Sequence, residues 1–157
     1  MSFAHPVRIY WEDTDAGGIV FYANYLKFME RARTEWLRSL GIEQQKLRET
    51  SGGIFVVSET SLKYHRPARL DDQLLVTAQL RQAGTASLII EQRVLSNPER
   101  KSAPEELPAQ ALLCEGTIRI GWVNAASMRP SRLPASVSTV FERIASRGTP
   151  PGAASQQ

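Results

Sequence analysis

Apolar and charged residues alternate along residues 22–40 with the three- and four-residue spacing of an α-helix. This spacing predicts one long amphipathic helix of about 16 residues with a single buried stripe. The predicted stripe is Tyr22, Tyr25, Leu26, Met29, Ala32, Trp36, Leu37 and Leu40. The predicted exposed side is Lys27, Glu30, Arg31, Arg33, Glu35 and Arg38. Asn24 is a candidate N-cap, and Gly41 stands where a left-handed residue ends a helix.

Five other stretches have the composition or the two-residue alternation of β-strands. They cover residues 8–11, 54–64, 73–81, 87–95 and 109–123. In the second stretch, strict alternation puts Phe55 and Val57 on the opposite face from Ser58, Thr60 and Leu62. Gly84-Thr85 predicts a hairpin between the third and fourth stretches, and Gly116 and Gly121 predict a bulge or bend in the last.

The remaining segments are polar or short. Residues 43–51 predict a helical turn or loop, and residues 97–108, with three prolines and five charges, predict an exposed connection. A second apolar stripe predicts a short helix over residues 135–145. The segment 146–157 consists mainly of Gly, Pro, Ala, Ser and Gln, so we expect one folded domain over residues 1–145 and a disordered tail after it.

The order of these elements is one strand, a long helix and four strands, which indicates an α+β fold with a five-stranded antiparallel sheet. The sheet has to bury one face against the only long apolar helix. Its free edges favour pairing with another copy of the chain. At 157 residues the chain is a single domain, and a site shared between subunits fits that size.

Composition excludes several classes of function. The chain is 42% hydrophobic and 22% charged, as globular proteins are, and its net charge of +3 without a basic run argues against nucleic acid. It has no apolar window long enough to span a membrane, so we expect a cytoplasmic protein without stable membrane insertion. The single Cys114 agrees with a reducing compartment and predicts a small buried residue. Metal-ligand spacings and the Gly-x-Ser-x-Gly elbow do not occur, so we expect no metal or other cofactor.

A carboxylate stands just ahead of the predicted long helix. Asp15 is followed by Gly17-Gly18, a pair that permits a sharp turn between strand and helix. The unpaired amides and partial positive charge of a helix N-terminus favour a developing oxyanion, and we expect Asp15 on the rim of that site. The alternative is that Asp15 only caps the turn, as aspartate before glycine often does.

The run Tyr10-x-x-Asp13-Thr14-Asp15-x-x-Gly18-x-Val20-x-Tyr22-x-x-Tyr25, followed by Glu30-Arg31-Ala32-Arg33, resembles the signature of the hotdog-fold acyl-CoA thioesterases. Within that superfamily the chain is most similar to the 4-hydroxybenzoyl-CoA thioesterase type and to its Tol-Pal-associated branch. The resemblance implies a sheet curved around a central helix. It also implies a homodimer or homotetramer with paired active sites at the dimer interface, and an acyl-CoA substrate.

In these families the second aspartate of the Asp-x-Asp pair is the catalytic carboxylate, a role that falls on Asp15. The carboxylate either attacks the thioester carbonyl to give a mixed anhydride or deprotonates a water molecule, and the sequence leaves both open. Asp13 is expected to stabilise the turn. The residue seven positions after Asp15 is often a histidine in the Tol-Pal-associated branch; here it is Tyr22, a feature of the 4-hydroxybenzoyl type. Its backbone amide is the candidate donor to the carbonyl.

Further residues are candidates for binding the substrate. The resemblance makes Gly18, Tyr22 and Tyr25 substrate-binding residues, and we expect Phe55 and Ser58 to line the acyl pocket from the neighbouring subunit. Arginine suits the phosphates of coenzyme A, and the candidates are Arg66, Arg69, Arg129 and Arg132. For each arginine the alternative is ordinary solvated surface charge.

Three functions are compatible with the sequence. The first is a Tol-Pal-associated thioesterase acting on aliphatic acyl-CoA, and the second is a thioesterase for an aromatic, hydroxybenzoyl-type acyl-CoA, which Tyr22 supports. The third is a non-catalytic hotdog protein that binds acyl thioesters. Asp15 argues against the third function, because a binding protein has no need of a carboxylate beside a thioester carbonyl.

Overall fold

In a computed structural model of the protein, the structure describes residues 3–97 and 110–148. Their order along the chain is strand, helix, helix, four strands and helix. The elements are β1 (Phe3–Arg8), a 3-10 turn (Trp11–Asp13), α1 (Asn24–Ser39), α2 (Gln44–Ser51), β2 (Gly53–Tyr64), β3 (Gln73–Ala83), β4 (Ser87–Ser96), β5 (Leu112–Asn124) and α3 (Ala135–Gly148). All of the predicted connection over residues 97–108 except Asn97 lies outside the described residues, as does the predicted tail over residues 146–157 from residue 149 onward.

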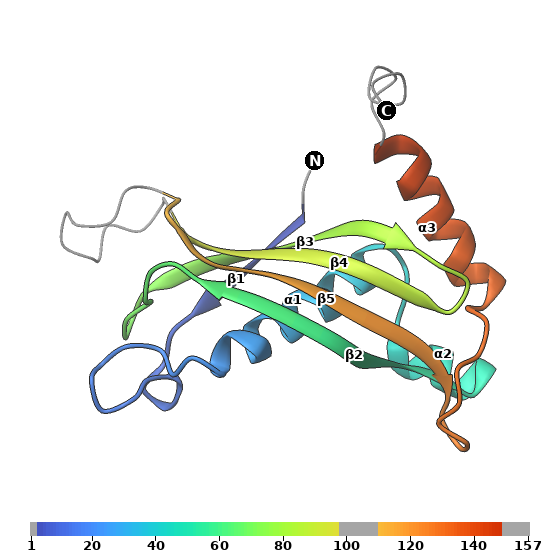
Figure 1. The fold of residues 1–157 in the computed structure, drawn as a ribbon, viewed down its shortest axis with the longest axis horizontal. Coiled ribbons are helices and arrows are strands. Elements are labelled where there is room, and N and C mark those ends of the chain that lie inside the picture. The colour runs from blue at the N-terminus through green and yellow to red at the C-terminus, as the bar shows by residue number, and fades with distance from the viewer. Residues whose placement is uncertain (1–2, 98–109, 149–157) are drawn as a thin grey trace.

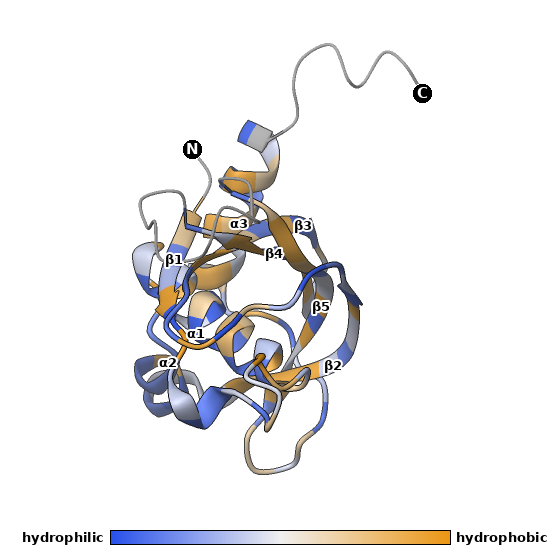
Figure 2. Cartoon of the chain, turned by 90° about the vertical axis from the view of Figure 1, so that its left-hand side faces the viewer, coloured by the Kyte–Doolittle hydropathy of each residue, from blue (hydrophilic) through white to orange (hydrophobic). Residues whose placement is uncertain are grey.

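The five strands form one antiparallel sheet in the order β1-β3-β4-β5-β2. Figure 1 shows α1 running along one face of this sheet, and Figure 2 shows the strands arching around it. The hairpin between β3 and β4 is the predicted one, and β1 and β2 are the two edges. This arrangement confirms the α+β fold with an antiparallel sheet wrapped around one central helix.

The stripe of α1 is buried mainly as its periodicity predicts. Tyr25, Met29, Ala32, Trp36 and Leu37 lie in the core together with Phe28, which the predicted stripe omitted. The prediction that Tyr22 and Leu26 are buried is wrong, because both are exposed at the N-terminal end of the helix. There the helix begins at Asn24, so Tyr22 precedes the helical repeat.

The two ends of α1 differ in how well the sequence predicted them. Ala23 occupies the N-cap position, so the prediction of Asn24 as the N-cap is wrong. The Asn24 side chain instead donates from Nδ2 to the Asp13 carbonyl at 2.8 Å. Gly41 has φ +83°, which confirms the left-handed residue predicted at the C-terminal end.

Arg33 is buried between α1 and the sheet. Its predicted place on the exposed side of the helix is therefore wrong. Its Nη1 donates to Gln92 Oε1 at 2.9 Å, and Gln92 Nε2 donates in turn to the carbonyls of Met29 and Thr77. Burial lowers the pKa of the Arg33 guanidinium, while the nearby Glu30 carboxylate acts in the opposite direction. The arginine therefore ties the middle of α1 to the sheet through a neutral partner.

A β-bulge at Ser58 breaks the predicted alternation of β2. Val57 pairs with Ile120 of β5 and Glu59 pairs with Arg119, so Ser58 is the extra residue. Ile118 and Ile120 are buried on the face of the sheet that is turned toward α1, the inner face. Their cross-strand partners Thr60 and Val57 therefore lie on the inner face too. Phe55, Leu62 and Tyr64 are on this face for the same reason, facing Trp122, Gly116 and Cys114 of β5.

The boundaries of β1 and β5 differ from the predicted ones, because local hydrogen bonds set where these strands begin and end. The strand predicted at residues 8–11 is β1 at Phe3–Arg8, because the Tyr10 amide donates to Asp13 Oδ2 and closes a turn. In β5 the register shifts beside Leu113, and pairing is regular at Gly116 and Gly121, so of the predicted bulge or bend at these glycines the bulge is wrong. β5 also begins three residues later than predicted, at Leu112 rather than at residue 109.

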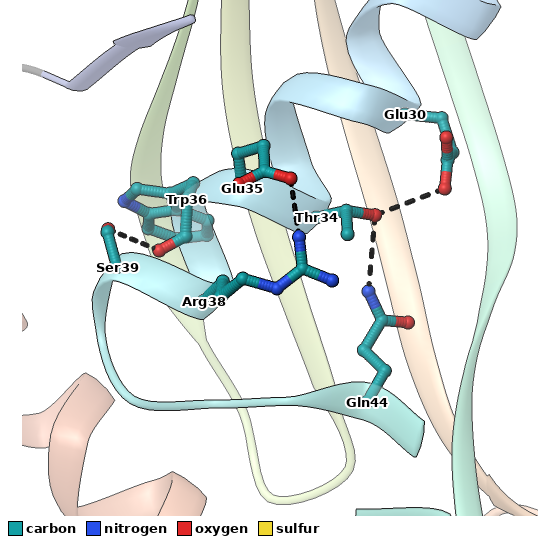
Figure 3. Close-up of polar contacts among 7 residues, drawn as sticks. All are labelled: Glu30, Thr34, Glu35, Trp36, Arg38, Ser39 and Gln44. Atoms are coloured by element: carbon teal, nitrogen blue, oxygen red, sulfur yellow. Dashed lines mark hydrogen bonds and ion pairs between the residues drawn. The ribbon is translucent and has the colours of Figure 1, made fainter. Parts of the chain in front are cut away.

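The flanking helices complete the core and the surface around α1. Phe141 of α3 packs against Trp36 of α1 with ring centroids 5.8 Å apart. α3 extends to Gly148, so the predicted end of this helix at residue 145 is three residues too early and residues 146–148 belong to the helix, not to the tail. The predicted turn at residues 43–51 is α2, and Figure 3 shows Thr34 of α1 donating to Glu30 while it accepts from Gln44 at the start of α2. In the described part of the chain, no helix is long and apolar enough to cross a membrane.

The first residue of β2 gives a test of the packing at the edge of the sheet. A Cβ added at Gly53 would overlap the rigid indole ring of Trp122, whereas one added at Gly121 meets only the Ala86 carbonyl at 3.9 Å. We expect Gly53→Ala to lower the free energy of unfolding by about 1–3 kcal/mol and Gly121→Ala to change it by less than about 1 kcal/mol, measured by urea denaturation. Equal effects of the two substitutions would contradict this packing.

Candidate active site

The segment between the 3-10 turn and α1 folds back on itself as a tight loop. Thr14 pairs with Val20, and the Asp15 amide donates to the Ile19 carbonyl at 2.8 Å. The Gly18 amide donates to the Asp15 carbonyl, and Gly18 has φ +78°, a conformation that side chains rarely adopt. The predicted glycine turn is confirmed, and it holds Asp15 at an exposed position.

The Asp15 carboxylate uses one oxygen to hold this loop. Its Oδ1 accepts from the Gly17 amide at 2.8 Å, so the turn-capping interpretation describes a real contact. Oδ2 has no hydrogen-bond partner among the described residues. Capping the turn therefore occupies half of the carboxylate and leaves the other oxygen available to a substrate or a water molecule.

Asp13 has a different environment from Asp15. Its side chain is buried, and Oδ2 accepts from the Tyr10 amide at 2.8 Å. Its carbonyl accepts from both the Phe21 amide at 3.0 Å and Asn24 Nδ2 at 2.8 Å. These bonds join the 3-10 turn to the start of α1, which is the turn-stabilising role that the sequence analysis gave to Asp13.

Several backbone amides at the start of α1 are unpaired. The Asn24 amide donates to the Phe21 carbonyl at 2.8 Å, but the Tyr22, Ala23 and Tyr25 amides have no acceptor among the described residues. Adjacent free amides at a helix N-terminus, such as those of Tyr22 and Ala23, carry partial positive charge and bind oxyanions. The predicted donor at Tyr22 is thus joined by a neighbour, Ala23, that no sequence pattern indicated.

Aromatic side chains surround these amides. The Tyr22 ring is 64% exposed and packs against the rings of Phe21 and Tyr64, with centroids 4.8 and 6.3 Å away. The Tyr64 hydroxyl donates to the Tyr22 carbonyl at 2.8 Å. No spacing rule connects residues 42 positions apart, so no sequence pattern indicates this contact. The segments around the Asp15 loop have further exposed apolar side chains, which are Tyr10, Trp11, Leu26 and Leu70.

Tyr25 is buried beneath this surface. Its hydroxyl accepts from the Ala68 amide at 3.1 Å, and the Val20 amide donates to the Ala68 carbonyl at 2.9 Å. Both contacts hold the segment after β2 beside the loop of Asp15. Tyr25 therefore supports the site from below, and its predicted contact with a substrate stays a prediction.

The predicted arginines fall into two groups. Arg66 and Arg69 are exposed on the segment held by Tyr25, and Arg69 pairs with Ile19 in the Asp15 loop. Arg129 and Arg132 lie at the opposite end of β2, since the Arg129 carbonyl accepts from Asn124, the partner of Gly53. Within one chain only Arg66 and Arg69 are near Asp15.

Phe55 and Ser58 are also remote from Asp15 within one chain. Phe55 is nine residues before Tyr64 on β2, which is about 30 Å at the rise of a strand. It lies beside a cavity of about 120 Å³ between α1 and β2, whose other lining residues are Glu30, Arg33, Thr34, Leu37, Gln44, Val57 and Ile120. Ser58 donates from its hydroxyl to the Arg119 carbonyl at 3.3 Å. A single chain therefore does not join these two residues to the carboxylate.

Other titratable groups give no sign of a metal site or a second nucleophile. No cluster of three or more His, Cys, Asp or Glu side chains suited to a metal ion occurs in residues 3–97 and 110–148. Cys114 is buried, as predicted, and burial raises the pKa of its thiol to about 11. The thiol is therefore protonated at neutral pH and is a poor nucleophile.

Comparison with known proteins gives consistent matches. The model of the thioesterase superfamily (4HBT) matches residues 17–103. The chain is 37% identical to the acyl-CoA thioesterase YbgC of Haemophilus influenzae over 91% of this chain and 96% of that protein. It is 38% identical to the acyl-CoA thioester hydrolase YbgC of Escherichia coli, covering 90% and 96%. Among solved structures, the 1,4-dihydroxy-2-naphthoyl-CoA thioesterase Slr0204 of Synechocystis shares the fold, with a TM-score of 0.76, 21% identity and coverage of 96% and 100%.

Proposed function

Because the chain belongs to the thioesterase superfamily, we propose that it hydrolyses acyl-CoA thioesters to a free acid and coenzyme A, with Asp15 as the catalytic carboxylate. Its sheet around α1 is the hotdog fold of that superfamily. One observation carries the assignment of the site: the free oxygen of Asp15 and the adjacent free amides of Tyr22 and Ala23 occur in one short segment. Together they supply the carboxylate and the oxyanion donors that the reaction needs.

The chemistry follows from these groups. The thioester carbonyl oxygen binds the amides of Tyr22 and Ala23, which stabilise the negative charge that develops on it. In one route Asp15 Oδ2 attacks the carbonyl carbon, the carbon–sulfur bond breaks, and coenzyme A leaves as a thiolate. Water then hydrolyses the mixed anhydride and restores the carboxylate. In the other route Asp15 accepts a proton from the attacking water.

A second copy of the chain completes the site in this proposal. β2 is an edge strand, and a free edge pairs readily with another strand. If the 12-residue β2 strands of two copies pair antiparallel over their full length, Phe55 of one copy lies opposite Leu62 of the other. That register puts Phe55 near the partner's Tyr64, and so near the partner's reaction centre. It accounts for a homodimer, or a homotetramer of two such dimers, with Phe55 and Ser58 contributed across the interface.

The same pairing brings the separated arginines together. Arg129 and Arg132 lie at the Gly53 end of β2, whereas Arg66 and Arg69 follow its Tyr64 end. Antiparallel pairing places the two ends side by side, so each composite site has arginines from both copies. We propose that they bind the phosphates of coenzyme A, because guanidinium groups form paired hydrogen bonds with phosphate.

A substrate screen identifies which acyl group the enzyme prefers. Aliphatic acyl-CoA is the first choice, and an aromatic acyl-CoA is the alternative that Tyr22 supports. A thiol-detecting reagent reports release of coenzyme A from a panel of both kinds, while a non-catalytic binding protein releases none. A cytoplasmic location and an association with the Tol-Pal system stay predictions.

The first prediction separates the two aspartates. Asp15→Asn is expected to keep the fold and to lower turnover by about two orders of magnitude or more, because it removes the nucleophile or base. Asp13→Asn is the matched control, since its carbonyl-type oxygen still accepts from the Tyr10 amide; we expect a much smaller loss. Full activity in folded Asp15→Asn, or equal losses in both variants, contradicts the assignment.

The second prediction concerns assembly. We expect no stable monomer at micromolar concentration in sedimentation velocity, because the proposed site needs both copies. Val57→Lys places a charge on β2 and is expected to dissociate the dimer. Ala4→Lys places the same charge on the other edge strand, β1, and is expected to leave the dimer intact. An active monomer contradicts the composite site.

The third prediction tests the backbone of Tyr22 against its hydroxyl. Tyr22→Phe keeps the amide and the ring packing, so kcat/KM is expected to fall less than tenfold, or about 1.4 kcal/mol. A phenol is a poor base at neutral pH. A loss of a hundredfold or more at unchanged thermal stability, with partial activity in Tyr22→His, shows that the hydroxyl takes part instead.

A further inference from the structure

The hydrogen bond from Tyr64 to Tyr22 joins two segments that are far apart in the sequence. Tyr64 is the last residue of β2, and its hydroxyl donates to the Tyr22 carbonyl at 2.8 Å. That carbonyl belongs to the same peptide group as the Ala23 amide. Because a peptide group is planar, fixing the direction of the carbonyl also fixes the direction of the N–H on its opposite side.

The adjacent free amides of Tyr22 and Ala23 belong to peptide groups whose carbonyls are held. The Tyr22 amide shares its peptide with the Phe21 carbonyl, which accepts from the Asn24 amide at 2.8 Å. The Ala23 amide shares its peptide with the Tyr22 carbonyl, which Tyr64 holds. The first restraint comes from the helix backbone, whereas the second comes from a side chain on the sheet.

We propose that Tyr64 is a positioning residue for the oxyanion site: its hydroxyl orients and polarises the Tyr22–Ala23 peptide so that the Ala23 amide donates to the thioester oxygen. The inference rests on the proposed function and adds a residue to it. A hydrogen bond to a carbonyl also strengthens the donor at the other end of the same peptide group. Tyr64 thus increases the stabilisation of the oxyanion without touching the substrate.

The surroundings of Tyr64 suit this role. Its ring packs edge-on against the rings of Tyr25 and Tyr22, with centroids 5.6 and 6.3 Å away, which restricts the position of the hydroxyl. Desolvation raises the pKa of Tyr64, and the neighbouring Cys114 and Tyr22 act in the same direction. The hydroxyl therefore stays protonated, and so remains a donor, over the whole neutral pH range.

Tyr64→Phe tests the proposal because it removes the hydroxyl and keeps the ring. We expect kcat to fall roughly three- to tenfold with KM changed less than about twofold, since the lost interaction acts on the transition state. The Ala23 amide signal in an NMR spectrum of the alanine-labelled protein is expected to move upfield, because its peptide is less polarised. Ser146→Ala removes an exposed hydroxyl on α3 that likewise donates to a backbone carbonyl, that of Arg143, and is expected to change neither readout.

The outcomes separate the role of Tyr64 from the proposed function. Wild-type kcat in Tyr64→Phe, or a rise in KM with unchanged kcat, contradicts the role of Tyr64. If Asp15→Asn is inactive at the same time, the proposed function is not affected by that result. An unmoved Ala23 signal contradicts the proposed polarisation. Wild-type turnover in Asp15→Asn contradicts the proposed function itself, whatever Tyr64→Phe does.

Discussion

The structure depends on the burial of α1 against the inner face of one curved sheet. Phe28, Met29 and Leu37 are buried from solvent in this contact, and Arg33 adds a polar tie through Gln92. Because the helix is fixed along its length, its first turn has a fixed position at one end of the sheet. Amides such as those of Tyr22 and Ala23 can therefore remain unpaired there without the helix end fraying, since packing elsewhere supplies the stability that a capping side chain otherwise gives.

The edge strand β2 connects this helix end to the surface of the sheet. Its last residue, Tyr64, contacts the Tyr22 carbonyl, and its first residues lead to Phe55 at the other end of α1. One chain thus presents a reaction centre at one end of the strand and a cavity at the other. In the proposed antiparallel pair of β2 strands each reaction centre would meet the partner's cavity, so that two copies of this small domain would enclose a substrate together.

Periodicity predicted the elements of the fold because it reports which face of each element is buried. It predicted α1, the β3–β4 hairpin and the glycine turn beside Asp15, with errors of a few residues at the ends. It failed where one contact overrides the average pattern. The bulge at Ser58 moves Thr60 to the inner face, and Gln92 gives Arg33 a partner inside the core. Both depend on residues distant in the sequence, as does the contact of Tyr64 with Tyr22.

The two aspartates of the loop show why residue type alone did not define the site. Asp13 and Asp15 are two residues apart and chemically identical, and their difference comes only from their partners. Asp13 is buried and its Oδ2 accepts from the Tyr10 amide, so its carboxylate is shielded from solvent and is already part of the turn. Asp15 is exposed and gives one oxygen to Gly17. That single bond holds the carboxylate in place while its second oxygen stays free. The proposed reactive group needs to be held and also to keep a free oxygen, because an unheld carboxylate has no fixed direction and a fully bonded one has no free lone pairs.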